Sequence, residues 1–270
     1  MNATRGALLA LLVTAAGLSA APPESPLIDK EALIEQFLAV DGRQRAQLHD
    51  LVLDAEYYEG RISEGEFQAE ARFLKRVFIK FAKDTALYRE EYREYYRDGV
   101  QQSPEETAKQ ARDRLEKNRK RNARNIAYPM LRPFRPENRK DYEIAYVGLD
   151  EVEDTTCYHF RVTPKVKTDE HIAGDYYFET DGFHLVRVDF SPARLVKKAM
   201  FKLDRLDMSI VYGPAPEGFW LPKQFDVAGR GKAALFFGVN FAGTEYYRNP
   251  QINVGQSDTL FKSEDADNGE

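Results

Sequence analysis

Histidine and cysteine are the side chains of this chain best suited to catalysis or metal binding, and few are present. A metal cluster or a hydrolytic site could be drawn from the later histidines and nearby acids, because imidazole and carboxylate groups bind metals and transfer protons. The spacing argues against it, since the chain has no HExxH, no paired cysteines and no short His-x-His. We expect histidines on the surface or packed between strands, and no metal site. The residues concerned are His49, His159, His171 and His184, with Asp175, Glu179 and Asp189 nearby.

Other nucleophiles and phosphate-binding patterns are equally weak. Cys157 has no helix N-terminus or cationic cluster in its local sequence to lower its pKa, so we interpret it as a buried, unreactive side chain. Ser191 lacks the Gly-x-Ser-x-Gly elbow of serine hydrolases. The glycine-rich, basic segment at 229–232 is too short for a phosphate loop and predicts a hairpin turn. We expect neither catalytic residues nor a cofactor, and therefore a protein that is not an enzyme.

Residues 1–21 have the pattern of a secretory signal peptide. Arg5 supplies the positive flank, residues 6–16 form an apolar run, and residues 17–21 are the small residues that precede the end of a signal peptide. The apolar run is shorter than the roughly 20 residues that a spanning helix requires, and no comparable run follows. We therefore expect an exported protein.

Charge and cysteine content restrict the class further. The chain has 39 basic and 44 acidic side chains, a net charge of -5, which argues against a general nucleic-acid binder. A single cysteine cannot form an intrachain disulfide, so stability must come from a hydrophobic core. We expect one domain over residues 22–255, followed by an acidic, disordered tail at 256–270.

The first part of this domain combines a helix with strands. Residues 27–42 predict an amphipathic helix with Asp29 as its cap. Residues 48–99 could be long helices or a strand meander. Turn pairs at strand-like intervals favour the meander, because glycine is costly inside a helix. These pairs are Glu59-Gly60, Glu64-Gly65, Lys83-Asp84 and Asp98-Gly99.

A strongly basic helix is expected over residues 103–126. Ser103 is its predicted cap, and Pro104 lies in its first turn. Its basic face could bind anionic lipid headgroups or an acidic partner. It could equally be a solvated cover helix whose charges pair with acids on the same helix. The candidate membrane- or partner-binding residues are Arg119, Lys120, Arg121 and Arg124.

Residues 141–247 predict an antiparallel sheet. Apolar side chains alternate along seven segments, and Asp181-Gly182 is a hairpin signal between two of them. The segments are linked by turns rather than crossover helices, which favours a wide, curved sheet. Residues 231–247 are apolar on both faces, so this strand needs a partner on each side.

On these segments the chain resembles the outer-membrane lipoprotein-sorting proteins, the periplasmic lipoprotein-carrier-like superfamily, in a larger variant. The resemblance is carried by the signal peptide, the helix around 32–38, and the runs YEIAYVGLDEVEDTTCYHFRVTPK, YYFETDGFHLVRVDFSP and WLPKQFDV. It implies an α+β fold: an incomplete, half-open antiparallel β-barrel covered by helices, with acyl chains or hydrophobic ligands held on its concave side. It also implies a periplasmic location. The basic helix is a departure from the short carriers.

The resemblance predicts a hydrophobic cavity, with a lipid, a lipoprotein acyl chain or another hydrophobic ligand as the partner. The same aromatic stripes could instead form a solid core, because the sequence does not say which face points inward. The protein would then be an envelope scaffold that binds an inner- or outer-membrane protein through its basic helix or convex sheet, with peripheral membrane contact. The expected cavity-lining residues are Phe160, Tyr176, Phe178, Val186, Val188, Phe190, Met208, Phe225 and Phe237.

Overall fold

The computed structural model describes residues 28–81, 86–120, 130–168, 170–195, 197–198, 201–233, 237–255 and 260–261. The signal peptide expected at 1–21 lies outside these residues, as does most of the expected tail. Among the helices of the described part, none is both long enough and apolar enough to cross a membrane.

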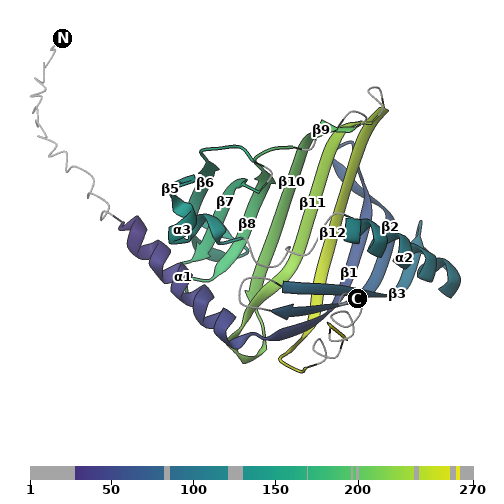
Figure 1. The fold of residues 1–270 in the computed structure, drawn as a ribbon, viewed down its shortest axis with the longest axis horizontal. Coiled ribbons are helices and arrows are strands. Elements are labelled where there is room, and N and C mark those ends of the chain that lie inside the picture. Colours follow the sequence, from purple (N-terminus) through teal and green to yellow (C-terminus); the bar gives the residue numbers. More distant parts are fainter. Residues whose placement is uncertain are drawn as a thin grey trace, which may run out of the picture.

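One antiparallel sheet dominates the described structure (Figure 1). Its twelve strands follow the order β4-β3-β2-β1-β12-β11-β10-β8-β7-β6-β5, with the short β9 paired to β10, so the sheet is open between β4 and β5. The first four strands are β1 (Asp50–Ser63), β2 (Glu66–Phe81), β3 (Ala86–Arg97) and β4 (Val100–Gln101). The others are β5 (Tyr142–Val152), β6 (Thr155–Pro164), β7 (Ile172–Glu179), β8 (Leu185–Pro192), β9 (Lys197–Lys198), β10 (Phe201–Pro214), β11 (Trp220–Ala233) and β12 (Phe237–Ile252).

The strand meander expected at 48–99 is confirmed, with one correction to its turns. Gly65 and Gly99 follow Glu64 and Asp98 with positive φ at all four residues, as tight hairpins require. Gly60 makes no turn. It lies at a bulge inside β1, where an added Cβ would be 1.9 Å from the carbonyl oxygen of Gln68, so only glycine fits there. The pair expected at 83–84 lies outside the described residues.

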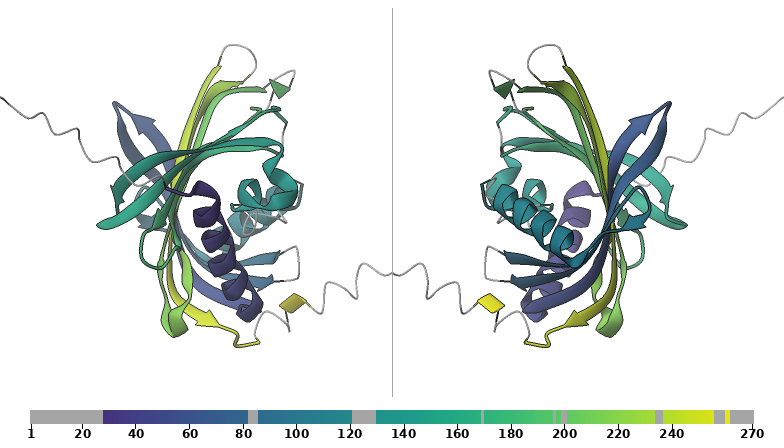
Figure 2. Two further views of the ribbon diagram at one scale, coloured as in Figure 1. Left: turned by 90° about the vertical axis from the view of Figure 1, so that its left-hand side faces the viewer. Right: turned by 90° about the vertical axis from the view of Figure 1, so that its right-hand side faces the viewer.

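Three helices lie on the same side of the sheet, within its curvature (Figure 2). In α1 (Lys30–Gln47) the Asp29 carboxylate accepts hydrogen bonds from the backbone of Glu31 and Ala32, which confirms the cap, although the helix extends five residues beyond the expected end. In α2 (Pro104–Lys120) the Ser103 hydroxyl accepts from the Glu106 backbone at 3.3 Å. The segment after α2 contains the 3-10 turn η1 (Arg132–Phe134) and the short α3 (Pro136–Arg139).

The strands β5–β8 form a packed end of the molecule, in which side chains fill the concave side. Phe37 from α1 stacks on Phe178 with ring centroids 3.8 Å apart. Phe134 from η1 meets Tyr176 and Phe178 edge-on at 5.0 and 5.5 Å and is fully buried. A second apolar cluster lies apart from this one, on β1, β2 and the start of β11.

Two residues of the expected tail differ from the expectation of disorder. Phe261 is 2% exposed and packs against Val52 and Phe78. The Leu260 carbonyl accepts a hydrogen bond from Arg89 at 3.4 Å. An apolar pair within the acidic tail is therefore fixed to the sheet, because burying the Phe261 ring offsets the cost of ordering it.

Candidate functional site

A cavity of about 930 Å³ lies between α1, α2 and the concave side of the sheet. This volume is within the range of roughly 300–1,000 Å³ that is typical of small-molecule sites. Most of its walls come from β1, β2, β3, β10, β11 and β12, which we call the hollow end of the molecule, and Phe178 of β7 and Leu185 of β8 border it. Unlike the packed end, it has no aromatic side chain inserted from η1.

One wall of the cavity is apolar because of strand register. Leu51 opposes Ile79, and Leu53 opposes Val77, in the β1–β2 pair. Alternate residues of a strand share a face, so these four side chains form one continuous surface. The same surface is extended by Leu48 and Leu221.

The same rows end in a buried group of ionisable side chains. Lys75 shares the inward face of β2 with Val77 and Ile79. Its ammonium forms ion pairs with Glu90 and, at 2.9 Å, with Glu245. The three side chains are 4%, 5% and 9% exposed. The hydroxyls of Tyr88 and Tyr92 donate to the Glu90 carboxylate, each at 2.9 Å. We call Lys75, Glu90 and Glu245 the buried triad.

The two carboxyl groups of the triad are not equivalent. Burial raises the pKa of Glu245, and the nearby Glu90 charge adds to the rise, outweighing Lys75. Burial alone would also raise the pKa of Glu90, but Lys75 and the two tyrosine hydroxyls together hold it below its ordinary value. Burial opposes the charge of Lys75, yet the two carboxylates raise its pKa. Glu90 is therefore the carboxylate that stays charged beside Lys75, and Glu245 is the carboxyl group that takes up a proton more readily.

α2 covers this polar part of the cavity through Arg114. Its guanidinium forms an ion pair with Glu59 on β1 at 2.6 Å and lies 4.0 Å from the centroid of the Phe73 ring. Of the basic residues proposed for partner binding, Arg119 and Lys120 fall in the last turn of α2, where side chains lie outside the described structure. Arg121 and Arg124 lie outside the described residues altogether.

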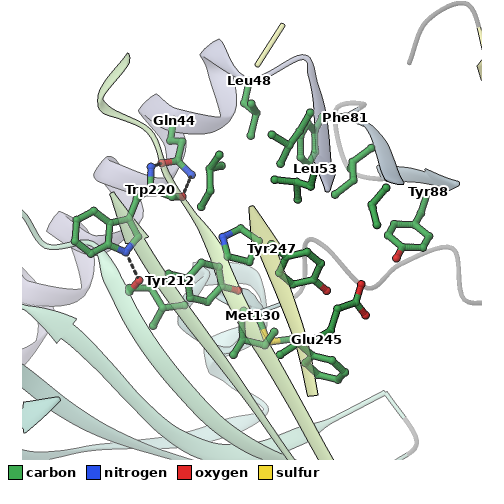
Figure 3. A pocket seen from close by; sticks show the side chains of 18 of the residues that line it. Gln44, Leu48, Leu53, Phe81, Tyr88, Met130, Tyr212, Trp220, Glu245 and Tyr247 are labelled. Carbon is green, nitrogen blue, oxygen red and sulfur yellow. Dashed lines mark hydrogen bonds between the residues drawn. The ribbon is translucent and has the colours of Figure 1, made fainter. Parts of the chain in front are cut away.

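The opposite side of the cavity is closed by α1. Gln44 binds the backbone of Trp220 twice, accepting from its N–H at 2.7 Å and donating to its carbonyl at 2.9 Å. The Trp220 indole donates to the Leu185 carbonyl at 2.8 Å and stacks on His184. Both Gln44 and Trp220 line the cavity (Figure 3). Trp220 is the only tryptophan of the sequence, so its fluorescence reports on this wall.

The structure brings two of the nine expected lining residues to the cavity, Phe178 and Phe225. Phe237 is 72% exposed at the start of β12. The others do not line the cavity, because Phe37 and Phe134 occupy the concave side above the packed end. Phe160, Tyr176, Val188 and Phe190 lie in the packed core, Met208 packs against it, and Val186 is buried at 2% exposure.

Many of the lining residues that sequence reasoning missed lie in the meander at 48–99. The row Phe73, Lys75, Val77, Ile79 and Phe81 shares one parity. A lysine inside such an apolar row is the signal that could have located the site, because a buried ammonium requires carboxylate partners. Gly243 on β12 also shapes the site. An added Cβ there would be 2.7 Å from the Tyr57 hydroxyl, so this glycine makes room for a lining side chain.

The histidines are dispersed. His159 lies 2.8 Å from Asp175 and stacks on Tyr177, His171 contacts Thr168 at 2.9 Å, and His184 stacks on Trp220. His49 is held through its backbone, which donates to the Asn253 side chain. Over the described residues, no group of three or more His, Cys, Asp or Glu side chains is arranged to hold a metal ion. Burial raises the pKa of Cys157 to about 11, which keeps it in the thiol form.

No protein-family model matches the chain, and no curated protein matches it. Solved structures are similar to it at low identity. A DUF1329 family protein from Desulfovibrio piger is 14% identical, with 86% of this chain and 96% of that chain covered and a TM-score of 0.43. An outer membrane lipoprotein-sorting protein domain from Vibrio parahaemolyticus is 9% identical, with 86% and 98% covered and a TM-score of 0.43. A LolA superfamily protein from Nitrosomonas europaea is 9% identical, with 82% and 93% covered and a TM-score of 0.33.

These structures are what the chain is similar to, at low identity. What the protein binds is argued below from its own cavity.

Proposed function

We propose that this protein is a non-enzymatic, exported periplasmic carrier that holds one hydrophobic ligand, such as a lipid or a lipoprotein acyl chain, in the cavity of its hollow end. The observation that carries the proposal is the contrast between the two ends of one sheet. Aromatic rings fill the packed end, whereas about 930 Å³ is left at the other end beside an apolar wall. Globular interiors are normally close-packed, so a void of this size calls for an occupant.

Burial of a hydrocarbon chain supplies enough free energy for such binding. Each methylene group removed from water contributes about 0.8 kcal/mol. The wall of Leu51, Leu53, Val77 and Ile79 is already largely buried, so the ligand rather than the protein gains most from the contact. A long chain then needs few polar contacts.

The cellular location rests on the predicted signal peptide at 1–21. Export would place the protein in an aqueous compartment between two membranes, where a long-chain molecule needs a protein cover in order to move. A cavity closed on one side by α1 and on another by α2 provides such a cover.

The alternative, an envelope scaffold with a solid core, is less well supported. It requires the concave side to be filled along its whole length, and the cavity argues against that. The described cation of α2 that approaches the sheet, Arg114, is turned toward Glu59 and Phe73 rather than outward.

The experiment is detection of a co-purifying ligand combined with a blocked variant. Native mass spectrometry of gently purified protein should show an added mass, and lipid-stripped protein should bind a fluorescent long-chain alcohol. Val227 lines the cavity from β11, so Val227→Phe should fill part of the space and weaken binding about tenfold or more, since each displaced methylene contact costs about 0.8 kcal/mol. Val239→Phe on β12, outside the cavity lining, is the matched control. If the bare chain alone is seen and no probe binds, the carrier proposal fails.

A further inference from the structure

One end of the sheet, where β9 meets β10 and β11, carries a row of lysines. Lys197 of β9 lies directly opposite Lys202 of β10, which in turn lies directly opposite Lys232 of β11. Arg230, on the same face of β11 as Lys232, is opposite Arg205 of β10. All five side chains are exposed. Like charges directly opposite each other destabilise a strand pair, so this positive surface, which we call the basic end, favours an anionic partner.

Few acidic side chains compensate the basic end. Asp204 and Asp207 each form an ion pair with one of its cations. A hydrogen bond from Lys202 and the charges of two further cations of the basic end hold the pKa of Asp204 below its ordinary value. The sequence has no acidic residue over 194–203 or 228–240, so the positions there that lie outside the described structure add no negative charge.

An exposed aromatic ring lies at the same end. Phe237, the first residue of β12, is 72% exposed, and the next residue, Gly238, is opposite Lys232. Figures 1 and 2 show this end of β10, β11 and β12 at the top, above the three helices. The neighbouring β1–β2 hairpin, which Asn240 of β12 contacts through the Ile62 carbonyl, has two exposed acids that flank the basic end on that side only. They are Glu64 and Glu66.

The combination of cations with an exposed ring suits a lipid surface. Anionic headgroups are spread over a membrane and require no fixed geometry, so separate lysines and arginines attract them one by one. An exposed aromatic ring beside such cations enters the boundary between headgroups and acyl chains. An acidic protein would instead require a fitted surface of about 800 Å² on each partner, whereas the basic end offers only the ends of a few strands.

The charge of the whole chain would orient the protein at such a surface. The net charge is -5, so an anionic membrane repels most of the molecule. Screening limits these forces to about 8 Å at physiological ionic strength. Only an approach with the basic end first is therefore attractive.

We infer that the basic end docks on membranes that contain anionic lipids, with the Phe237 ring in the interface and the five cations at the headgroups. This goes beyond the proposed carrier function, because it assigns a second surface and a second partner. Val227 of the cavity lies roughly 16 Å from Lys232 along β11, so docking brings the cavity close to the membrane.

The test is sedimentation of the full mature chain with vesicles of phosphatidylcholine alone, or of an equal mixture with phosphatidylglycerol. We expect binding to the mixed vesicles only, with loss of binding at high salt. Lys202→Gln combined with Lys232→Gln should weaken binding about tenfold or more, since each lysine near an anionic surface contributes about fivefold. Lys140→Gln combined with Lys223→Gln makes the same change of charge at exposed positions elsewhere and should weaken it far less.

Phe237→Ser tests the role of the ring. Because the ring is exposed in the free protein, unfolding should be unchanged, while affinity for the mixed vesicles falls about tenfold. Leu149→Ser is the matched control, since Leu149 is 60% exposed on β5, away from the basic end. Equal loss of affinity in the two variants would contradict a specific contact of Phe237 with lipid.

Val227→Phe separates this inference from the carrier function. The blocked variant should still sediment with mixed vesicles, because docking does not use the cavity. Equal sedimentation with both kinds of vesicle, or equal losses in the two lysine pairs, would overturn the inference and leave the carrier function standing. Absence of sedimentation with the mixed vesicles would also overturn it and would favour an acidic protein as the partner of the basic end. The vesicle series needs only the unaltered protein, so it does not depend on the folding of a variant.

Discussion

Lys75 keeps its charge inside the protein because carboxylates on two other strands face it. The register of β1 with β2 places Lys75 opposite Ala55, a small residue that leaves room for the ammonium and its partners. Glu90 comes from the next strand, β3, and Glu245 from the distant β12, so all three strands must be assembled before the charge is compensated. The triad therefore depends on the complete hollow end of the sheet.

Replacing Lys75 should reveal how much the two carboxylates destabilise the fold when no cation compensates them. Lys75→Met keeps the length of the side chain but leaves Glu90 and Glu245 facing each other without a cation. We expect a loss of about 3–5 kcal/mol in the free energy of unfolding at pH 7, as is usual when one partner of a buried ion pair is removed. Urea denaturation measures it. A loss below about 1 kcal/mol, the value of an exposed pair, would contradict the burial of the triad.

The two glutamates should affect stability with opposite dependence on pH. The pKa of Glu245 is raised in the folded protein, so the wild type loses stability as pH rises from the unfolded value of about 4.5 through the folded pKa. Glu245→Gln should thus be more stable than the wild type at pH 8 and similar to it at pH 4. Thermal melts across this range provide the measurement.

Glu90→Gln is the matched comparison on the neighbouring strand. The pKa of Glu90 is lowered, so its charge stabilises the fold above about pH 4.5, and this contribution is lost as pH falls. The variant should therefore be less stable than the wild type at pH 8, with a difference that shrinks toward low pH. Equal destabilisation by both substitutions at pH 8 would show that the glutamates are equivalent, contrary to the structure.

At the scale of elements, two side chains tie the far end of α1 to the sheet: Gln44 itself, and Asn253, which donates to the Gln47 carbonyl at 2.7 Å. The two hydrogen bonds from Gln44 to the Trp220 backbone join residues 176 positions apart in the sequence. Each such bond contributes about 0.5–1.5 kcal/mol net. α1 is thus anchored at one end by Phe37 in the packed core and at the other by Gln44 beside the cavity.

Gln44→Ala should loosen this side of the cavity. We expect faster hydrogen exchange in the last turns of α1, a shift in Trp220 fluorescence and faster release of a bound probe, because both hydrogen bonds to β11 are lost. Gln36→Ala, on the exposed face of the same helix, controls for the change in side chain. If the two variants exchange and release alike, the Gln44 contact does not hold the helix.

Local features of the elements could be predicted from the sequence, whereas the position of the cavity could not. The caps at Asp29 and Ser103 and the hairpin turns depend on neighbouring residues, so a short segment of sequence is enough to predict them. The packing of Phe134 depends on where the proline-rich segment after α2 returns to the sheet. That segment fills the concave side over β5–β8. Because of this long-range contact, residues that were expected to line the cavity are packed in the core instead.

At the scale of the whole molecule, one sheet performs two tasks at its two ends. The packed end provides stability through interlocking aromatic rings, and the hollow end gives up close packing in order to keep a cavity. Stability and ligand binding should therefore respond to different substitutions, even though they share β10 and α1. This separation can be tested with one substitution at each end.

Phe134→Ala should destabilise the protein by about 3–5 kcal/mol, because removing a buried phenylalanine loses its transfer free energy and leaves a void. Its affinity for dodecanol, measured where the variant remains folded, should be unchanged, since Phe134 does not line the cavity. Val227→Phe should show the opposite pattern, with nearly wild-type unfolding and weakened binding. Paired urea titrations and Trp220 fluorescence titrations give both quantities for both variants. If Phe134→Ala lost affinity in proportion to its stability, the two ends would be coupled, and the packed core would be part of the ligand site rather than its support.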